Sequence, residues 1–155
     1  MFELITPPSS SLFPGSFSKR FQYAEDIERQ HVVKMSKLAG KERTRIHLLS
    51  DHKGNCYGFV ALSFSSFDRN FNRTSIIIDY VFTSYQYRGQ IFTELNTMKV
   101  FEYLLGVVFQ SAVTIQKILP VRFIALQPAT ERLAEYYRKI DFKSVESSDW
   151  MFLSI

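Results

Sequence analysis

The sequence has few of the residues that mark disulfide-bonded or membrane-spanning proteins. Its 155 residues include one cysteine, so no disulfide can form within the chain. No apolar run approaches the roughly 20 residues that a membrane-spanning helix requires, and residues 1–4 lack the basic and apolar regions of a signal peptide. We therefore expect a protein that works in a reducing, cytoplasmic setting without a membrane partner.

Histidine is also scarce, and its positions form no metal-binding motif. His31, His47 and His52 lack metal-ligand spacing and a partnered acidic motif. We assign them to the surface or to packing, and no metal site is predicted. Cys56 lies in an apolar strand-like pattern, where a small buried hydrophobic residue is a more common role than a nucleophile.

Apolar and aromatic side chains, in contrast, are abundant. Hydrophobic residues make up 46% of the chain and aromatic residues 15%, including fifteen phenylalanines. At this length, that content is typical of one folded domain with a real core. Phe64, Phe67 and Phe71 cluster around one expected loop, so they predict either a homodimer interface or core filling.

The net charge of +4 favours anionic ligands such as phosphorylated cofactors or RNA. The densest basic segment comprises Lys34, Lys37, Lys41, Arg43 and Arg45. It lacks the interleaved aromatic residues that stack on nucleobases, so a solvated helix end is the default interpretation. If RNA is the partner, these side chains would contact its phosphates.

Hydrophobic periodicity and turn residues predict one domain over residues 1–155, with a loose, proline-rich and serine-rich N-terminal segment over about residues 1–20. The expected elements are a helix over residues 23–38, strands over 45–50, 56–64 and Ser75–Thr83, a helix over 91–116, a strand over 121–127, a helix over 130–139 and a strand over 150–155. A polar turn at 51–55 joins the first two strands, and a loop covers 68–73. This order predicts the α+β class, with a mixed, mostly antiparallel sheet flanked by helices and a central β-α-β unit.

A glycine turn lies between an expected buried strand and an expected long helix. The segment Tyr85-Gln86-Tyr87-Arg88-Gly89-Gln90 follows the strand Ser75–Thr83 and precedes the helical pattern. At such a junction, the free amides of the first helical turn and the positive end of the helix dipole can bind a phosphate group. A plain strand-to-helix turn is the alternative interpretation, because turn glycines and loop arginines are common.

Two motifs together carry a resemblance to a known family. Gln86-Tyr87-Arg88-Gly89-Gln90-Ile91 resembles a Gln/Arg-x-x-Gly-x-Gly/Ala acyl-CoA loop, with Ile91 where Gly or Ala is usual. Residues 130–142 resemble a late helix with a Tyr pair, with Thr130 in place of Asn and Asp141 in place of Gly. With the β-α-β pattern between them, the motifs resemble the GNAT superfamily of acyl-CoA N-acyltransferases from the first expected helix to the C-terminus.

The resemblance implies acetyl-CoA as co-substrate and direct attack by a primary amine on its thioester. The residues implied to bind the donor are Val81, Phe82, Thr83, Gln86, Tyr87, Arg88, Gly89, Gln90, Ile91, Phe92, Thr93 and Thr130. The amides of residues 88–93 would hold the pyrophosphate. The acceptor could be an aminoacyl-tRNA, a peptide or a small amine.

The resemblance also implies Tyr137 as a general acid for the departing thiolate, and a core tyrosine is the alternative. Asp79, in register with Val81 and Thr83, is the candidate general base, and an ion-paired strand residue is the alternative. Ile91 either obstructs the donor or begins the apolar stripe of the long helix. A non-catalytic, degenerate GNAT-fold binding or regulatory module therefore stays open beside the enzyme.

Overall fold

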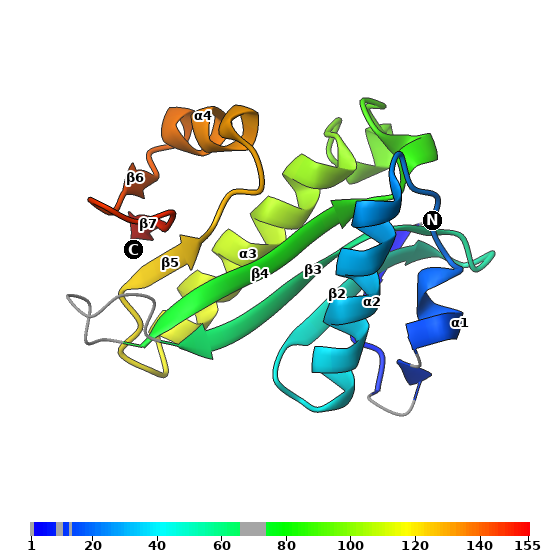
Figure 1. Ribbon diagram of the computed structural model, residues 1–155, viewed down its shortest axis with the longest axis horizontal. Coiled ribbons are helices and arrows are strands. Elements are labelled where there is room, and N and C mark those ends of the chain that lie inside the picture. Colours follow the sequence, from blue (N-terminus) through cyan, green and yellow to red (C-terminus); the bar gives the residue numbers. More distant parts are fainter. Residues whose placement is uncertain (1, 9–10, 13, 66–73) are drawn as a thin grey trace. The chain divides into compact units, whose positions relative to one another are not determined.

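The computed structural model of the 155-residue chain describes residues 2–8, 11–12, 14–65 and 74–155. The helices are α1 (Pro14–Ser18), α2 (Asp26–Gly40), α3 (Val100–Gln116) and α4 (Glu131–Lys139). The strands are β1 (Phe2–Ile5), β2 (Arg45–Asp51), β3 (Cys56–Ser65), β4 (Ser75–Thr83), β5 (Phe123–Leu126), β6 (Lys143–Ser144) and β7 (Met151–Ser154). Their hydrogen-bonded order is β1-β2-β3-β4-β5-β7-β6 (Figure 1).

The chain forms two compact units, which are described in turn. The first unit comprises Met1–Leu62 and Tyr80–Val107, and the second comprises Ser63–Asp79 and Val108–Ile155. Two strands, β3 and β4, and the helix α3 contribute residues to both units.

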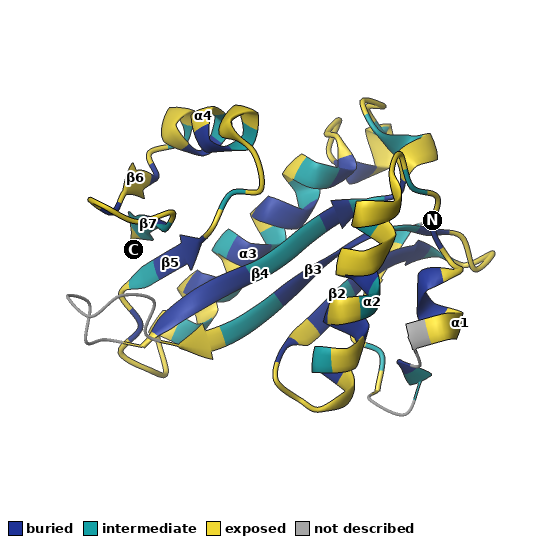
Figure 2. Cartoon of the chain, viewed as in Figure 1, coloured by how far each residue is buried: buried dark blue, intermediate teal, exposed yellow. Residues whose placement is uncertain are grey.

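In the first unit, α1 and α2 cover one face of β2 and β3 (Figure 1). Antiparallel pairing joins β1 to β2 and β2 to β3. Figure 2 shows α2 with a buried side and an exposed side, as an amphipathic helix on a sheet requires. The core between the helices and the strands consists of Leu12, Phe17, Phe21, Val32, Met35, Ala39, Ile46, Leu48, Cys56, Phe59, Ala61 and Phe82.

The prediction of a loose N-terminal segment is wrong. Phe2–Ile5 form β1 and pair with the end of β2, and Phe17 in α1 is 0% exposed. Prolines exclude a helix interior, but they are compatible with an edge strand nearby and with the first position of a helix, where Pro14 begins α1. The apolar side chains in this segment then supply part of the core.

In the second unit, β4 and β5 run parallel, β5 pairs antiparallel with β7, and β7 pairs antiparallel with β6. The parallel pair confirms the predicted β-α-β unit, and the mixed sheet confirms the predicted α+β class. One core cluster of this unit consists of Ile77, Ala125 and Val145, with the half-buried Phe123, Trp150 and Phe152 packed against it.

The long helix begins at Val100, so the prediction that it begins at Ile91 is wrong. The segment before it contains a short 3-10 turn, Thr93–Leu95, and an isolated bridge between Phe92 and Met98. Asn96 follows the turn in the left-handed region with φ 58°, which asparagine tolerates better than most residues. The apolar residues of this segment keep helical spacing, but its backbone does not form an α-helix.

Several other expectations depend on the part of the chain that the structure describes. Phe67, Phe71 and the loop 68–73 lie outside that part, Phe64 is exposed, and the homodimer stays a prediction. No helix among the described residues is long and apolar enough to cross a membrane. Within the same residues, no group of three His, Cys, Asp or Glu side chains could hold a metal ion.

Candidate functional site

The predicted donor-binding and catalytic residues are divided between the two units. The first unit contains Val81, Phe82, Thr83, Gln86, Tyr87, Arg88, Gly89, Gln90, Ile91, Phe92 and Thr93. The second unit contains Asp79, Thr130 and Tyr137. The first set lies on the end of β4 and on the segment 84–99 that leads to α3, called here the β4–α3 segment.

The second half of β4 continues past its pairing with β5. The parallel register covers residues 76–78 and ends with Ile78 opposite Leu126. Residues 79–83 continue the strand outside this register. Because each strand residue carries a backbone donor and acceptor, such a strand end can pair with an extended ligand.

Gly58 of β3 lets the end of β4 approach β3 closely. A Cβ atom at this position would overlap the carbonyl oxygen of Phe82 and would lie 3.2 Å from the Cα atom of Thr83. The amide of Ser84 also donates a hydrogen bond of 2.9 Å to the carbonyl of Tyr57 in β3. The end of β4 is therefore fixed on its β3 side.

Thr83 has a buried hydroxyl that lacks a hydrogen-bond partner among the described residues. Such a group costs about 1–3 kcal/mol of stability, which a ligand amide could restore. Phe82 next to it is 2% exposed and packs in the core of the first unit, so only its backbone can contact a ligand. The strand end therefore fits the amide-bearing arm of an acyl-CoA.

The glycine turn is closed by its own hydrogen bonds. Gly89 adopts φ 77°, a conformation that favours glycine, and open space lies where a side chain would be. The amide of Arg88 donates to the carbonyl of Tyr85 at 3.3 Å, and the amide of Gln90 donates to Tyr87 at 3.4 Å. Two of the amides that were expected to face a pyrophosphate, those of Arg88 and Gln90, thus bond within the turn.

Further along the β4–α3 segment, the amide of Phe92 donates to the carbonyl of Met98 at 3.0 Å. Its ring lies 5.4 Å from the ring of Phe2 and 5.8 Å from that of Tyr57, centroid to centroid. The Tyr87 ring lies 4.3 Å from Tyr57. These aromatic contacts hold the segment against β1 and β3.

Three other predicted residues on this segment have polar or exposed surroundings. Gln86 accepts a hydrogen bond of 2.5 Å from the Ser84 hydroxyl, and its carbonyl accepts one of 2.7 Å from the Gln90 amide group. Ile91 is 61% exposed, so the interpretation that it begins the apolar stripe of the helix is wrong. Thr93 is exposed at the start of the short 3-10 turn.

Arg88 points into the protein. Its Nε donates a hydrogen bond of 2.8 Å to the carbonyl of Thr83, and its Nη2 lies 2.6 Å from a carboxylate oxygen of Glu28 in α2. The guanidinium carbon lies 5.4 Å from the ring centroid of Phe82 and 5.7 Å from that of Tyr85. Burial acts to raise the pKa of Glu28, but hydrogen bonds from Arg88 and from the amide of Ala24 together have the larger effect. The pKa of Glu28 is therefore lower than its ordinary value.

The N-terminus of α3 is capped by a carboxylate of the same helix. Glu102 accepts a hydrogen bond of 3.1 Å from the amide of Lys99. A carboxylate in the first turn of a helix is stabilised by the dipole that would otherwise attract a phosphate group. The start of α3 therefore carries a negative charge that would oppose a pyrophosphate.

In the second unit, α4 holds Tyr137 between two well-formed helix ends. Thr130 caps the N-terminus by accepting a hydrogen bond of 3.2 Å from the amide of Leu133. At the other end, Asp141 adopts φ 77° and its amide donates to Arg138 at 3.1 Å. The amide of Phe142 donates to the carbonyl of Tyr137 at 3.0 Å, which completes a Schellman motif.

Tyr137 is 4% exposed, and its ring contacts those of Tyr136 and Phe142 at 5.8 and 5.3 Å. Burial raises the pKa of the Tyr137 phenol well above its ordinary value, with a smaller contribution from Tyr136. The phenol therefore keeps its proton at physiological pH and can donate a hydrogen bond. Asp79 is half-buried within β4, and its role as a base stays a prediction.

Sequence reasoning missed four residues that organise the first unit: Gly58, Ser84, Glu28 and Glu102. Two of them carried a readable signal. An isolated glycine within a strand pattern indicates close backbone approach, and Glu28 stands three residues after Glu25 at a helix start, which is capping-box spacing.

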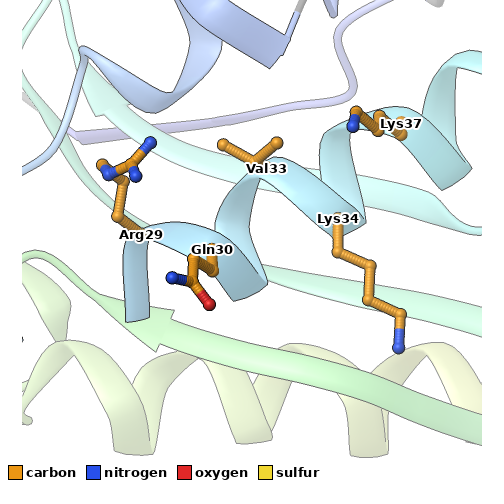
Figure 3. A pocket seen from close by; sticks show the side chains of 5 residues that line it. All are labelled: Arg29, Gln30, Val33, Lys34 and Lys37. Atoms are coloured by element: carbon orange, nitrogen blue, oxygen red, sulfur yellow. The ribbon is translucent and has the colours of Figure 1, made fainter. Parts of the chain in front are cut away.

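A shallow depression of about 380 Å³ lies on α2 and is lined by Arg29, Gln30, Val33, Lys34 and Lys37 (Figure 3). Arg29 pairs with Asp26 at 2.8 Å, which partly neutralises it. Lys34 and Lys37 are exposed, and the helix has no acidic residue after Glu28. The depression is therefore a basic surface.

The strand order, the parallel β4–β5 pair connected through α3, and the late helix α4 define the fold of the GNAT acetyltransferases. No family model matches the sequence, and no curated protein matches it either. The solved structures described next confirm, at the level of the fold, the resemblance inferred from the two motifs.

Several solved structures share this fold over nearly the whole chain. The crystal structure of AtaTR bound with acetyl-CoA has a TM-score of 0.77 at 13% identity, and the match covers 99% of this chain and 92% of that one. AtaT complexed with acetyl-methionyl-tRNAfMet has a TM-score of 0.78 at 12% identity, with 99% and 95% covered. The KacTA–DNA complex has a TM-score of 0.75 at 18% identity, with 99% and 92% covered.

Proposed function

We propose that this protein is an N-acetyltransferase that uses acetyl-CoA and a primary amine. The observation that carries the proposal is the end of β4, which continues outside the β5 register and ends in the unpartnered hydroxyl of Thr83. An extended, amide-bearing ligand would pair with such a strand end. The similar AtaTR structure was solved with acetyl-CoA bound.

The residues of the two units have separate roles in the proposed reaction. When bound, acetyl-CoA supplies a thioester carbonyl that a neutral amine attacks directly. Backbone groups of Val81 and Phe82, with the Thr83 hydroxyl, align the donor. Tyr137 remains protonated because burial raises its pKa, so it can hydrogen-bond the sulfur as a thiolate departs. Asp79 is the proposed acceptor of the amine proton, directly or through water.

We further propose that the amine is carried by RNA, as in an aminoacyl-tRNA. The basic face of α2 supports this, because Lys34, Lys37 and Lys41 are exposed and no acidic residue lies between Glu28 and Lys41. Arg43 continues the exposed positive charge beyond the helix. Phosphate groups bind such surfaces through counterion release. AtaT, which shares the fold, was solved with acetyl-methionyl-tRNAfMet. Because acetyl-CoA and tRNA both occur in the cytoplasm, a cytoplasmic reaction is part of this proposal.

A second candidate function is a non-catalytic binding or regulatory module on the same fold. Two observations favour it. The amides of Arg88, Gln90 and Phe92 bond within the protein instead of facing a ligand, and Glu102 occupies the start of α3. A fold that retains its sheet but closes the phosphate site could bind a partner without transferring an acyl group.

Calorimetric titration with acetyl-CoA, followed by steady-state kinetics of Tyr137→Phe, separates the two functions. An acetyltransferase should bind the donor, and Tyr137→Phe should lower kcat about 100-fold, because a hydrogen-bond donor to the leaving group is lost. Donor affinity should change little. Tyr136→Phe is the matched control, since Tyr136 is only half-buried on the same helix. No heat up to millimolar acetyl-CoA would reject the transferase and leave the binding module.

The RNA acceptor is tested by the salt dependence of tRNA binding. Replacing Lys34, Lys37 and Lys41 together by glutamine should weaken binding and reduce the slope of log affinity against log salt by about 2 to 3. The control replaces Lys117, Lys139 and Lys143, which are equally exposed but belong to the second unit. Equal effects of the two triple replacements would reject α2 as the RNA surface.

A further inference from the structure

The sequence motif assigns only the backbone amide of Arg88 to the pyrophosphate, and the contacts of the Arg88 side chain indicate a separate role for it. Both of its polar contacts lie inside the first unit: the carbonyl of Thr83 at 2.8 Å and the carboxylate of Glu28 at 2.6 Å. Its flat guanidinium group also stands near the rings of Phe82 and Tyr85. The Arg88 and Glu28 side chains are only 33% and 22% exposed, so water screens the pair less than a surface pair.

Glu28 is held in place independently of Arg88. Its Oε1 atom accepts hydrogen bonds of 2.7 Å from the amide of Ala24 and 3.3 Å from the amide of Glu25. The bond from the amide of Glu25 is part of the capping box at the start of α2. The other carboxylate oxygen, Oε2, faces Arg88. Glu28 therefore joins the first turn of α2 to the guanidinium group.

The chain before α2 makes a second set of bonds to the same strand end. The amide of Gln22 donates to the Ser84 hydroxyl at 2.8 Å, and the amide of Tyr85 donates to the carbonyl of Gln22 at 2.8 Å. The segment 22–28 thus bonds directly to the Ser84 hydroxyl and the Tyr85 amide, and it reaches the carbonyl of Thr83 through Arg88. The orientation of the peptide between Thr83 and Ser84 follows from these bonds.

We propose that Arg88 and Glu28 are a positioning pair that sets the orientation of the β4 end, and with it the Thr83 hydroxyl, for the acyl donor. This inference rests on the proposed function, because it assigns the pair a role in donor binding. Arg88 itself does not contact the phosphates. It acts through the carbonyl of Thr83, and Glu28 holds its guanidinium group in the required direction.

Two conservative variants separate this role from a purely structural one. Arg88→Lys keeps the charge but loses the Nε donor and the planar geometry that joins two acceptors. Glu28→Gln removes the charge facing Arg88 while its amide oxygen can still accept the hydrogen bonds of the capping box. Each should raise the KM for acetyl-CoA about 10-fold, with kcat within 2-fold of the wild type, because ground-state and transition-state binding are weakened equally.

The double variant Glu28→Gln with Arg88→Lys should raise KM by much less than the product of the single effects, since both residues act through one contact. Asp26→Asn is the matched control: it removes an acidic group from the same helical turn, but Asp26 bonds to Arg29 and Gln30. Its donor KM, measured with a small amine as acceptor, should equal that of the wild type.

Amide hydrogen exchange gives a second readout that does not require turnover. The amides of Ser84 and Tyr85 should exchange about 10-fold faster in Arg88→Lys and Glu28→Gln than in Asp26→Asn, because the strand end opens more often. A wild type that neither binds nor uses acetyl-CoA would overturn the proposed function, and unchanged exchange would overturn the positioning role. An active wild type with unchanged KM in both variants would also overturn the positioning pair.

Discussion

Two segments differ in whether the residues of a motif and the backbone structure expected from it occur together. They are the glycine turn of the first unit and the helix α4 of the second unit. The turn keeps Gln86 and Gly89 of the acyl-CoA motif, yet the amides of Arg88 and Gln90 bond within the turn and the helix begins only at Val100. In α4, the family's Asn and Gly are replaced by Thr130 and Asp141, yet both helix ends form. A motif residue can therefore be present without its backbone role, and a backbone role can be filled by another residue.

The difference has a physical cause. Helix capping depends on one side-chain oxygen or one left-handed residue, which several residue types supply. A phosphate cradle depends on several amides pointing at the same place, so one internal hydrogen bond or one altered helix start removes it. The following predictions test this comparison, beginning with the largest expected effect.

The strongest test of the first unit is Gly58→Val. The added side chain would overlap the carbonyl of Phe82, so β3 and β4 would have to separate and the free energy of unfolding should fall by about 3 kcal/mol. Urea unfolding measures this loss. The control is Gly106→Ala in α3, where nothing lies within 4 Å and helix propensity predicts a gain of about 0.5–1 kcal/mol. Equal losses at both glycines would refute the close approach of the strands.

In α4, Thr130→Ala should lower the free energy of unfolding by about 1 kcal/mol, because the amide of Leu133 loses its acceptor. Thr130→Asn should be close to neutral, since Asn is at least as good a cap. Thermal unfolding of the three proteins measures both changes. If Asn were as destabilising as Ala, a side-chain oxygen alone would not be enough to cap this helix. The claim that several residue types can fill the capping role in α4 would then be wrong.

The start of α3 offers a test of whether Glu102 opposes the binding of phosphate groups. Glu102→Gln keeps an oxygen that can accept from Lys99 but removes the negative charge, so acetyl-CoA should bind several-fold more tightly. The free energy of unfolding should fall by about 0.5 kcal/mol. Calorimetric titration measures the binding, with Glu94→Gln as the control, since Glu94 lies on the same segment outside α3. Unchanged affinity would mean that the phosphates bind away from this helix.

The smallest effect is expected at the end of α4. Asp141→Gly should raise the free energy of unfolding by about 0.5 kcal/mol, because glycine adopts the left-handed φ of 77° without steric cost. Asp141→Ala should lower it by a similar amount. Differential scanning calorimetry can resolve the two shifts. A loss in the glycine variant would show that the aspartate side chain, not the backbone, stabilises this end.

The sequence predicted most of the sheet because its strands are continuous apolar runs bounded by turn residues. It did not predict β1 or β6, which are short edge strands whose pairing depends on partners elsewhere in the chain. The start of α3 was missed because the apolar spacing continued through Ile91 while left-handed Asn96 and the cap at Glu102 fixed the actual start.

Candidate site residues could be named from the sequence where they lie within one motif, but not where their contacts depend on a distant side chain. The end of β4 and Tyr137 follow from the motifs, and the structure gives both a surrounding that suits them. The inward direction of Arg88 could not be predicted, because it requires Glu28 from α2 to lie beside it. A local pattern cannot contain that information.

Trp150, the single tryptophan of the chain, packs against the core cluster of the second unit. Its intrinsic fluorescence therefore reports on that unit alone, whereas far-ultraviolet circular dichroism reports on the helices of both. Coincident melting curves from the two signals would mean that the units unfold in one cooperative step, and separated curves would mean that they unfold in sequence. The chain thus carries a spectroscopic label that distinguishes its two halves without chemical modification.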